Sequence, residues 1–169
     1  MARSPVIVVP YDPAWPAFFA SIKAHLAVAL GETALAIEHV GSTSVPGLAA
    51  KPIIDIDAVI ASEADLPQAI GKLAGVGYQH EGEIGIVGRH AFRQPDGLPK
   101  HHLYVCAVGN AELKRHLAFR DHLRENDHDA QAYGDLKQEL AQRFGSDRDG
   151  YTEAKTAFVE KMLRKAAGD

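Results

Sequence analysis

Two carboxylates interrupt an otherwise aliphatic segment, Ile53–Ile60, in the first half of the chain. Side chains alternate between the two faces of a strand, so Asp55 and Asp57 are expected on one face, roughly 7 Å apart, with three of the isoleucines on the other. A buried carboxylate without a partner is costly, so this strand predicts a cation, a basic partner or a solvent-filled cleft. Because two carboxylates at this separation can share a divalent cation, we predict that Asp55 and Asp57 are catalytic and metal-binding residues.

A turn-rich segment, Val40–Leu48, comes a few residues before the acidic strand. Its glycine, Gly41, is followed by three hydroxyl residues in a row, Ser42, Thr43 and Ser44. Backbone N–H groups and hydroxyls in such a turn can bind phosphate, although an ordinary Gly/Ser/Pro loop is an alternative of at least equal weight. Phosphate donors beside paired carboxylates are the parts that a phosphoryl or nucleotidyl transfer site requires.

Basic residues and histidines near these two segments supply further candidates. Lys51 lies between the turn and the strand and could neutralise a phosphate oxygen, with a solvated loop lysine as an equally weighted alternative. Arg93 ends a predicted strand facing the same region, and its guanidinium suits a phosphate or a carboxylate. Most of the nine histidines are expected to be structural or exposed. His102, and after it His39, are the candidate metal ligands among them.

The C-terminal helical region carries two sets of candidates at helical spacing. His116, Arg120 and Arg124 are four residues apart and form a basic stripe, a pattern typical of a solvated helix face. Arg120 is nevertheless a candidate for substrate binding. Tyr133 and Lys137 are also four apart and share a helix face. We expect Tyr133 to pack and Lys137 to reach the cleft.

The bulk properties predict a single soluble domain spanning residues 1–169. Acidic residues number 22 and basic residues 18, which gives a net charge of −4 and makes nucleic acid an unlikely partner. No apolar stretch approaches the ~20 residues that span a bilayer. Cys106 is the only cysteine, so an intramolecular disulfide is impossible and a reducing cytoplasm is the expected location. Its apolar surroundings favour a buried structural thiol.

The pattern of apolar residues predicts an α+β domain in which helices pack on one side of the sheet. A helix is expected from an Asp12 N-cap, with Pro13 at its first position, to Leu30, with apolar residues every four positions from Phe18. A second helix is expected at Leu66–Gly75. The predicted strands are Val6–Val9, Leu35–Val40, the acidic strand, Tyr78–Glu83, Ile86–Arg93 and His102–Val108. From Asn110 onward three helices are expected.

The segment Glu38–Asp57 resembles the signature of the GrpB family. Three further segments, Tyr11–Trp15, His101–Val105 and Phe119–Arg124, are similar to the same family in the same order. The resemblance covers nearly the whole chain. It implies the nucleotidyltransferase fold that DNA polymerase beta and aminoglycoside nucleotidyltransferases share, with a mixed β-sheet and a helical C-terminal part.

The resemblance also implies roles for particular residues. In that superfamily a Gly-Ser turn holds the triphosphate and an Asp-x-Asp strand binds two Mg²⁺ ions, which here points to Gly41, Ser42, Asp55 and Asp57. The superfamily's third acid lies on a later strand, where this chain has His102, a residue that suits Mn²⁺ or Zn²⁺ better than Mg²⁺. Other candidates for the third acid are Glu81, Glu83 and Asp96. A lysine of the helical part contacts the triphosphate in several members, and Lys137 is the candidate here.

These observations predict a nucleotidyltransferase that uses Mg²⁺ or Mn²⁺, a nucleoside triphosphate and a small acceptor. The missing third acid leaves an alternative, a catalytically inactive domain on the same fold that binds a nucleotide or a coenzyme A-related ligand or docks on a partner. A metal-dependent hydrolase built on the histidines is a third hypothesis. The family resemblance further implies a possible kinase partner in coenzyme A biosynthesis, because GrpB domains are fused to dephospho-coenzyme A kinase in some bacteria.

Overall fold

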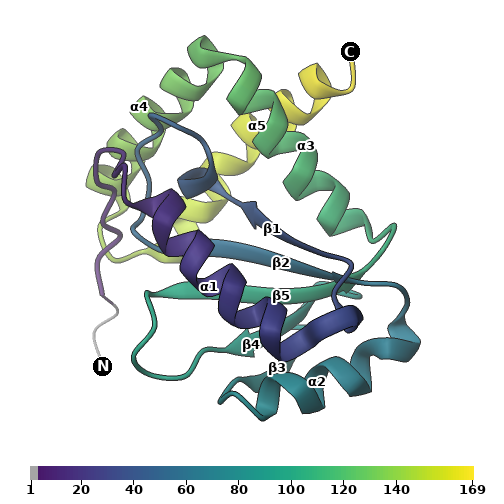
Figure 1. Cartoon of the computed structure of the whole chain (residues 1–169). Coiled ribbons are helices and arrows are strands. Elements are labelled where there is room, and N and C mark those ends of the chain that lie inside the picture. The colour runs from purple at the N-terminus through teal and green to yellow at the C-terminus, as the bar shows by residue number, and fades with distance from the viewer. Residues whose placement is uncertain (1–3) are drawn as a thin grey trace.

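The computed structural model describes residues 4–169, which form a five-stranded mixed sheet surrounded by helices (Figure 1). The first three residues of the predicted domain lie outside the described part. The strands are β1 Ala36–Val40, β2 Ile54–Ile60, β3 Gln79–Gly82, β4 His90–Arg93 and β5 His101–Ala107. They lie in the order β1-β2-β5-β4-β3. Strands β2 and β5 are parallel, and the other neighbours are antiparallel. The α+β class with a mixed sheet is confirmed.

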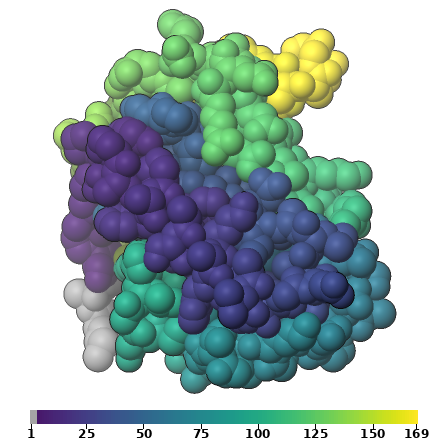
Figure 2. Space-filling model, viewed as in Figure 1, coloured from purple at the N-terminus to yellow at the C-terminus, as the bar shows by residue number. Residues whose placement is uncertain are grey.

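Two helices cover one face of the sheet, and three more form the C-terminal part. Helix α1 spans Trp15–Leu30 and α2 spans Leu66–Ala74. Seen from their side, α1 in purple and α2 in teal hide most of the sheet (Figure 2). The C-terminal helices are α3 Ala111–Glu125, α4 Asp127–Phe144 and α5 Arg148–Ala166. Three short 3₁₀ turns, Gly31–Thr33, Ser42–Ser44 and Glu63–Asp65, connect elements of the first half.

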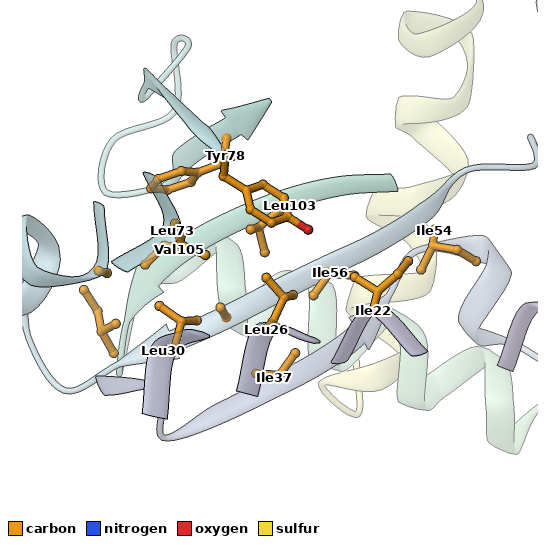
Figure 3. Packing of buried hydrophobic residues seen from close by; sticks show 14 of the residues in the cluster. Ile22, Leu26, Leu30, Ile37, Ile54, Ile56, Leu73, Tyr78, Leu103 and Val105 are labelled. Atoms are coloured by element: carbon orange, nitrogen blue, oxygen red, sulfur yellow. The ribbon is translucent and has the colours of Figure 1, made fainter. Parts of the chain in front are cut away.

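The main core forms between β2 and α1, as the alternation in the acidic strand predicts. Ile54 and Ile56 are buried against Ile22 and Leu26 of α1 (Figure 3). Each fully buried aliphatic side chain contributes roughly 1.5–3 kcal/mol. Since a slip of one residue would exchange the two faces of the strand, this packing fixes Asp55 and Asp57 on the opposite face.

Helix α3 packs on that opposite face, near the ends of β2 and β5. Its Leu113 contacts a small cluster with Val59 and Cys106. Cys106 is a free, buried thiol of this cluster, and burial raises its pKa to about 12, as expected for a packed thiol. The Asn110 side chain caps the helix by accepting the N–H groups of residues 112 and 113. These contacts position the following turns of α3 beside the carboxylates of β2.

The segment Val6–Val9 is not a strand, contrary to the sequence prediction. Only Val9 forms an isolated antiparallel bridge, with Ala50. The Val6 N–H instead donates to the Gly145 carbonyl oxygen at 2.9 Å. Val6 and Val8 of this segment pack on the C-terminal helices.

Helix α1 begins at Trp15, so the predicted start at Pro13 is wrong by two residues. Asp12 is not the N-cap; its Oδ1 accepts the Ala14 N–H at 2.8 Å in the turn before the helix. Phe18 is 41% exposed, because a spacing of four residues drifts by about 40° per step and turns it away from the buried face.

The strand predicted at Ile86–Arg93 begins only at His90. Gly85 and Gly88 adopt φ angles of 79° and 75°, which a β-ladder does not accommodate. Among the helices that the structure describes, none is long and apolar enough to cross a membrane. The cytoplasmic location stays a prediction from the lone cysteine.

Candidate phosphate and metal site

The two predicted acids lie on β2 beside the glycine turn that follows β1. Asp57 is almost completely buried, with 1% of its surface exposed, whereas Asp55 is half-buried. Gly41 has a φ of 72°, and a Cβ added there would collide with the carboxylate of Asp55. The glycine is therefore required twice, for its left-handed backbone and for the close approach of the turn to the acid.

Replacing Gly41 with alanine is expected to destabilise the protein by about 3 kcal/mol, through backbone strain and the collision with Asp55. Gly47→Ala is the matched control, because Gly47 has a φ of 81° but no atom within 4 Å of an added Cβ. We expect the control to cost about 1 kcal/mol in urea unfolding. Equal losses in the two variants would show that the approach to Asp55 is not tight.

Each acid has a histidine partner. His102 is paired with Asp55 across the parallel strands, and its Nδ1 lies 3.0 Å from Asp55 Oδ1. His116, on α3, places its Nδ1 2.6 Å from Asp57 Oδ2 and its Nε2 3.2 Å from Glu112 Oε1. Burial alone would lower the pKa of His116, but the hydrogen bond to Asp57 and the charges of the three nearby carboxylates outweigh burial, so the pKa is raised. The raised pKa favours the protonated form of His116 beside the most buried acid.

The donor set fits a divalent ion that arrives with a phosphate. Asp57 Oδ1 is buried without a hydrogen-bond partner, and Asp55 lines the neighbouring cavity. Within residues 4–169 there is no group of three or more His, Cys, Asp or Glu side chains placed to hold a metal. Mg²⁺ is commonly held by one or two carboxylates together with substrate phosphates, so two acids can suffice. His102 as a direct ligand stays a prediction, because its Nδ1 already bonds Asp55.

A cavity of about 220 Å³ lies between the turn, β2 and the helices α4 and α5. Most of the predicted substrate-binding and metal-binding residues line it: Gly41, Ser42, Thr43, Lys51, Asp55, His102 and Lys137. Lys155 and Tyr151 of α5 also line it, whereas the predicted metal-binding residue Asp57 does not. Segments that are more than a hundred residues apart in the sequence therefore meet at one site.

Three lysines, Lys51, Lys137 and Lys155, line the cavity without an ion-pair partner at contact distance in the described part of the chain. Among the described residues, no carboxylate lies within 4 Å of any of their amines. Their Nζ atoms instead lie over aromatic rings, Lys137 at 4.7 Å from the Tyr133 centroid and Lys155 at 4.5 Å from that of Tyr151.

Burial and mutual repulsion make these ammonium groups costly. Burial, and then the charges of Lys155 and Lys51, lower the pKa of Lys137 to about 6. Burial, and then Lys51, lower that of Lys155 to about 8. The pKa of Lys51 is also lowered, chiefly by burial. A negatively charged group bound beside these lysines would offset this cost.

Three predicted substrate-binding residues do not line this cavity. The Ser44 hydroxyl donates to the Gly41 carbonyl oxygen at 2.5 Å and stabilises the turn. Arg93 is exposed and lies 3.6 Å from Glu81. Arg120 bonds Glu38 at 2.7 Å and also pairs with its neighbour in the chain, residue 121.

The basic stripe of α3 is not a solvated face, because all three of its members contact the sheet or the turn. His116 bonds Asp57, Arg120 also donates to the His39 carbonyl oxygen, and Arg124 donates to the Ser44 carbonyl oxygen. The sequence analysis missed the roles of His116 and Lys155. A usable signal existed for Lys155: α4 and α5 each carry a tyrosine followed by a lysine four residues later, Tyr133–Lys137 and Tyr151–Lys155.

Comparison with known proteins agrees with this architecture. A family model described as GrpB protein matches residues 5–165. The chain belongs to the GrpB family. A UPF0157 protein of Pseudomonas aeruginosa is 41% identical over 94% of this chain and 66% of its own length. A dephospho-CoA kinase of Mycolicibacterium paratuberculosis is 31% identical over 98% of this chain, which spans only 47% of that kinase. Several relatives are thus longer than this GrpB domain.

Two solved structures show which fold this family has. A conserved GrpB protein from Enterococcus faecalis is 40% identical, covers 95% of this chain and 96% of its own, and has a TM-score of 0.84. The Cid1 poly(U) polymerase with MgGTP bound is 12% identical, covers 80% of this chain and 45% of its own, and has a TM-score of 0.57. The second likeness shows the fold alone. The nucleotidyltransferase-like fold predicted for this GrpB-family chain is confirmed.

Proposed function

We propose that this GrpB-family chain binds a nucleoside triphosphate and transfers its nucleotidyl group to a small acceptor. The observation that carries the proposal is the meeting of three lysines, a Gly-Ser turn and the Asp55 carboxylate at one cavity, with Asp57 two residues further along the same face of β2. The lysines suit a polyphosphate, and the acids suit the divalent ion that accompanies it. The nucleotidyltransferase-like fold agrees with this assignment.

Some residues would bind the phosphates, and others would bind the metal ion. Lys137 and Lys155 would hold the phosphates from the helical side, and the N–H groups of the turn would hold them from the sheet side. Asp55 and Asp57 would hold Mg²⁺ or Mn²⁺ together with the phosphates. Such an ion supplies Lewis-acid stabilisation of charge that develops during an in-line displacement. His102 would keep the Asp55 carboxylate in one orientation through its hydrogen bond.

A second candidate function, a catalytically inactive ligand-binding domain, is supported by the contact between His116 and Asp57. A protonated His116 there would neutralise the acid, and β5 offers no third carboxylate. The lysine cavity would then bind the phosphates of a nucleotide or of a coenzyme A-related molecule without reaction. A coenzyme A biosynthesis kinase as partner stays a proposal, in keeping with the kinase relative. The hydrolase hypothesis gains no separate support, since the described residues hold no histidine-rich donor group.

Calorimetric titration of ATP and GTP, with and without Mg²⁺ or Mn²⁺, tests the proposal. We expect the metals to strengthen nucleotide binding to the wild type by roughly tenfold. The Asp55→Ala/Asp57→Ala double variant should lose that metal-dependent gain but keep binding by the lysines. Pyrophosphate release with an acceptor that depends on Asp57 would separate the enzyme from the inactive domain. Metal-independent binding that is equal in both proteins would contradict a metal-assisted site.

A further inference from the structure

A second cavity, of about 390 Å³, opens on the other side of the Gly41–Ser44 turn. It lies where the start of α1, the turn and the end of α3 meet. In Figure 2 this is the region where the blue of the turn reaches the surface between purple and green side chains. Residues that line it include Tyr11, Phe19, His39, Thr43, Pro46 and Arg124. Its size is within the range of roughly 300–1,000 Å³ that is usual for small-molecule sites. Apart from the turn residues Thr43 and Ser44, none of its residues belongs to the proposed nucleotide site.

One wall of this cavity is flat and uncharged. The rings of Phe19 and His39 are stacked, with centroids 4.6 Å apart and planes 17° from parallel. The His39 Nε2 lies 2.9 Å from the Thr43 hydroxyl. Burial, and then the charge of Arg124, lower the pKa of His39 to about 4, so the imidazole is neutral near pH 7. Tyr11 and two prolines add further rigid surface, which suits a planar ring.

The other end of the cavity carries a guanidinium with no acidic partner. Arg124 donates through Nε to the Ser44 carbonyl oxygen at 2.8 Å, and no carboxylate of the described chain lies within 4 Å of it. Its neighbour Arg120, by contrast, is engaged by Glu38 and Asp121. The terminal nitrogens of Arg124 are therefore the donors that remain for a carboxylate or phosphate.

We propose that this cavity is a binding site for a small anion that carries a planar ring. The ring would lie against Phe19 and His39, and the anionic group would pair with Arg124. Thr43 lines both this cavity and the lysine cavity, so a ligand here would touch the back of the turn that faces the nucleotide site. The proposal stands independently of nucleotide binding, because the two cavities use different basic residues.

Fluorine NMR titration with para-fluorobenzoate tests the site directly in the full chain. Arg124→Gln is expected to weaken binding about tenfold or more, since it removes the charge and the paired donors. Phe19→Leu should also weaken it, while leaving every charge in place. Arg115→Gln is the matched control on the same helix, because Arg115 is partly exposed and pairs with Glu160; it should change nothing.

Two further measurements separate this site from the lysine cavity and from misfolding. Lys137→Met should bind the probe as tightly as the wild type. In proton–nitrogen correlation spectra of the wild type, the probe should shift the amide signals of Phe19 and Ser44 and leave that of Lys155 in place. Loss of binding in Lys137→Met, or unchanged binding in both Arg124→Gln and Phe19→Leu, would overturn the proposal.

Discussion

Lys137→Met is expected to make the free protein more stable and, at the same time, to weaken its binding of nucleotide. The lysine is 2% exposed and has no carboxylate partner in the described chain, so the folded protein holds a buried charge or loses a proton to avoid it. Methionine keeps a similar length and volume without the ammonium group. We expect a gain of about 3 kcal/mol in the free energy of unfolding near neutral pH.

The pH dependence of this gain follows from the pKa of Lys137. It is about 6 in the folded chain against an ordinary 10.5, so the unfolded chain binds the extra proton between these values. The wild type therefore becomes more stable as the pH rises through this range, and its penalty is complete only below about pH 6. The gain in free energy of unfolding that Lys137→Met gives over the wild type should be largest below about pH 6. It should decrease as the pH rises toward 10.5.

Urea unfolding of the two proteins between about pH 6 and pH 9 measures the stability effect, and calorimetry with ATP measures the loss of binding, expected to be at least about tenfold. Lys161→Met is the matched control, since Lys161 is an exposed lysine of α5 and should alter neither quantity. If Lys137→Met is less stable than the wild type and binds nucleotide equally well, then Lys137 supports the fold and does not bind the nucleotide.

The parts of the fold that were predicted correctly are those that depend on local periodicity. Alternation in the acidic strand was enough to assign Asp55 and Asp57 to one face, because one buried face determines the register of a strand. A spacing of four likewise placed Tyr133 and Lys137 on one helix face. In the segment Val6–Val9 local propensity was misleading, because a strand needs a partner edge and this segment pairs only at Val9.

The parts of the site that were not predicted depend on how elements pack together. Whether His116 faces water or Asp57 is decided by the rotation of α3, which Leu113 sets through its contact with Val59. No pattern within α3 reports that contact, so the basic stripe looked like a solvated face. Arg120 was misplaced for the same reason: its partner Glu38 is 82 residues away in the sequence.

His116→Ala is expected to destabilise the protein by about 3 kcal/mol, because it leaves the buried Asp57 carboxylate without a cation. The free energy of unfolding in urea, in the presence of EDTA, measures this loss. Arg115→Ala is the neighbouring control; it breaks a partly exposed ion pair with Glu160, which should cost less than about 1 kcal/mol. A small loss in His116→Ala would mean that water can solvate Asp57.

The same variant decides whether His116 occupies the place of a metal ion. If the imidazolium and a divalent ion compete for Asp57, removing His116 should let Mn²⁺ or Mg²⁺ bind more tightly without nucleotide. Since a ligand that binds only the folded state stabilises it, the metals should then raise the melting temperature of His116→Ala more than that of the wild type. An Asp57→Asn/His116→Ala double variant should lose this response. Equal responses of the wild type and His116→Ala would mean that the ion, where it binds, does not use the oxygen of Asp57 that His116 contacts.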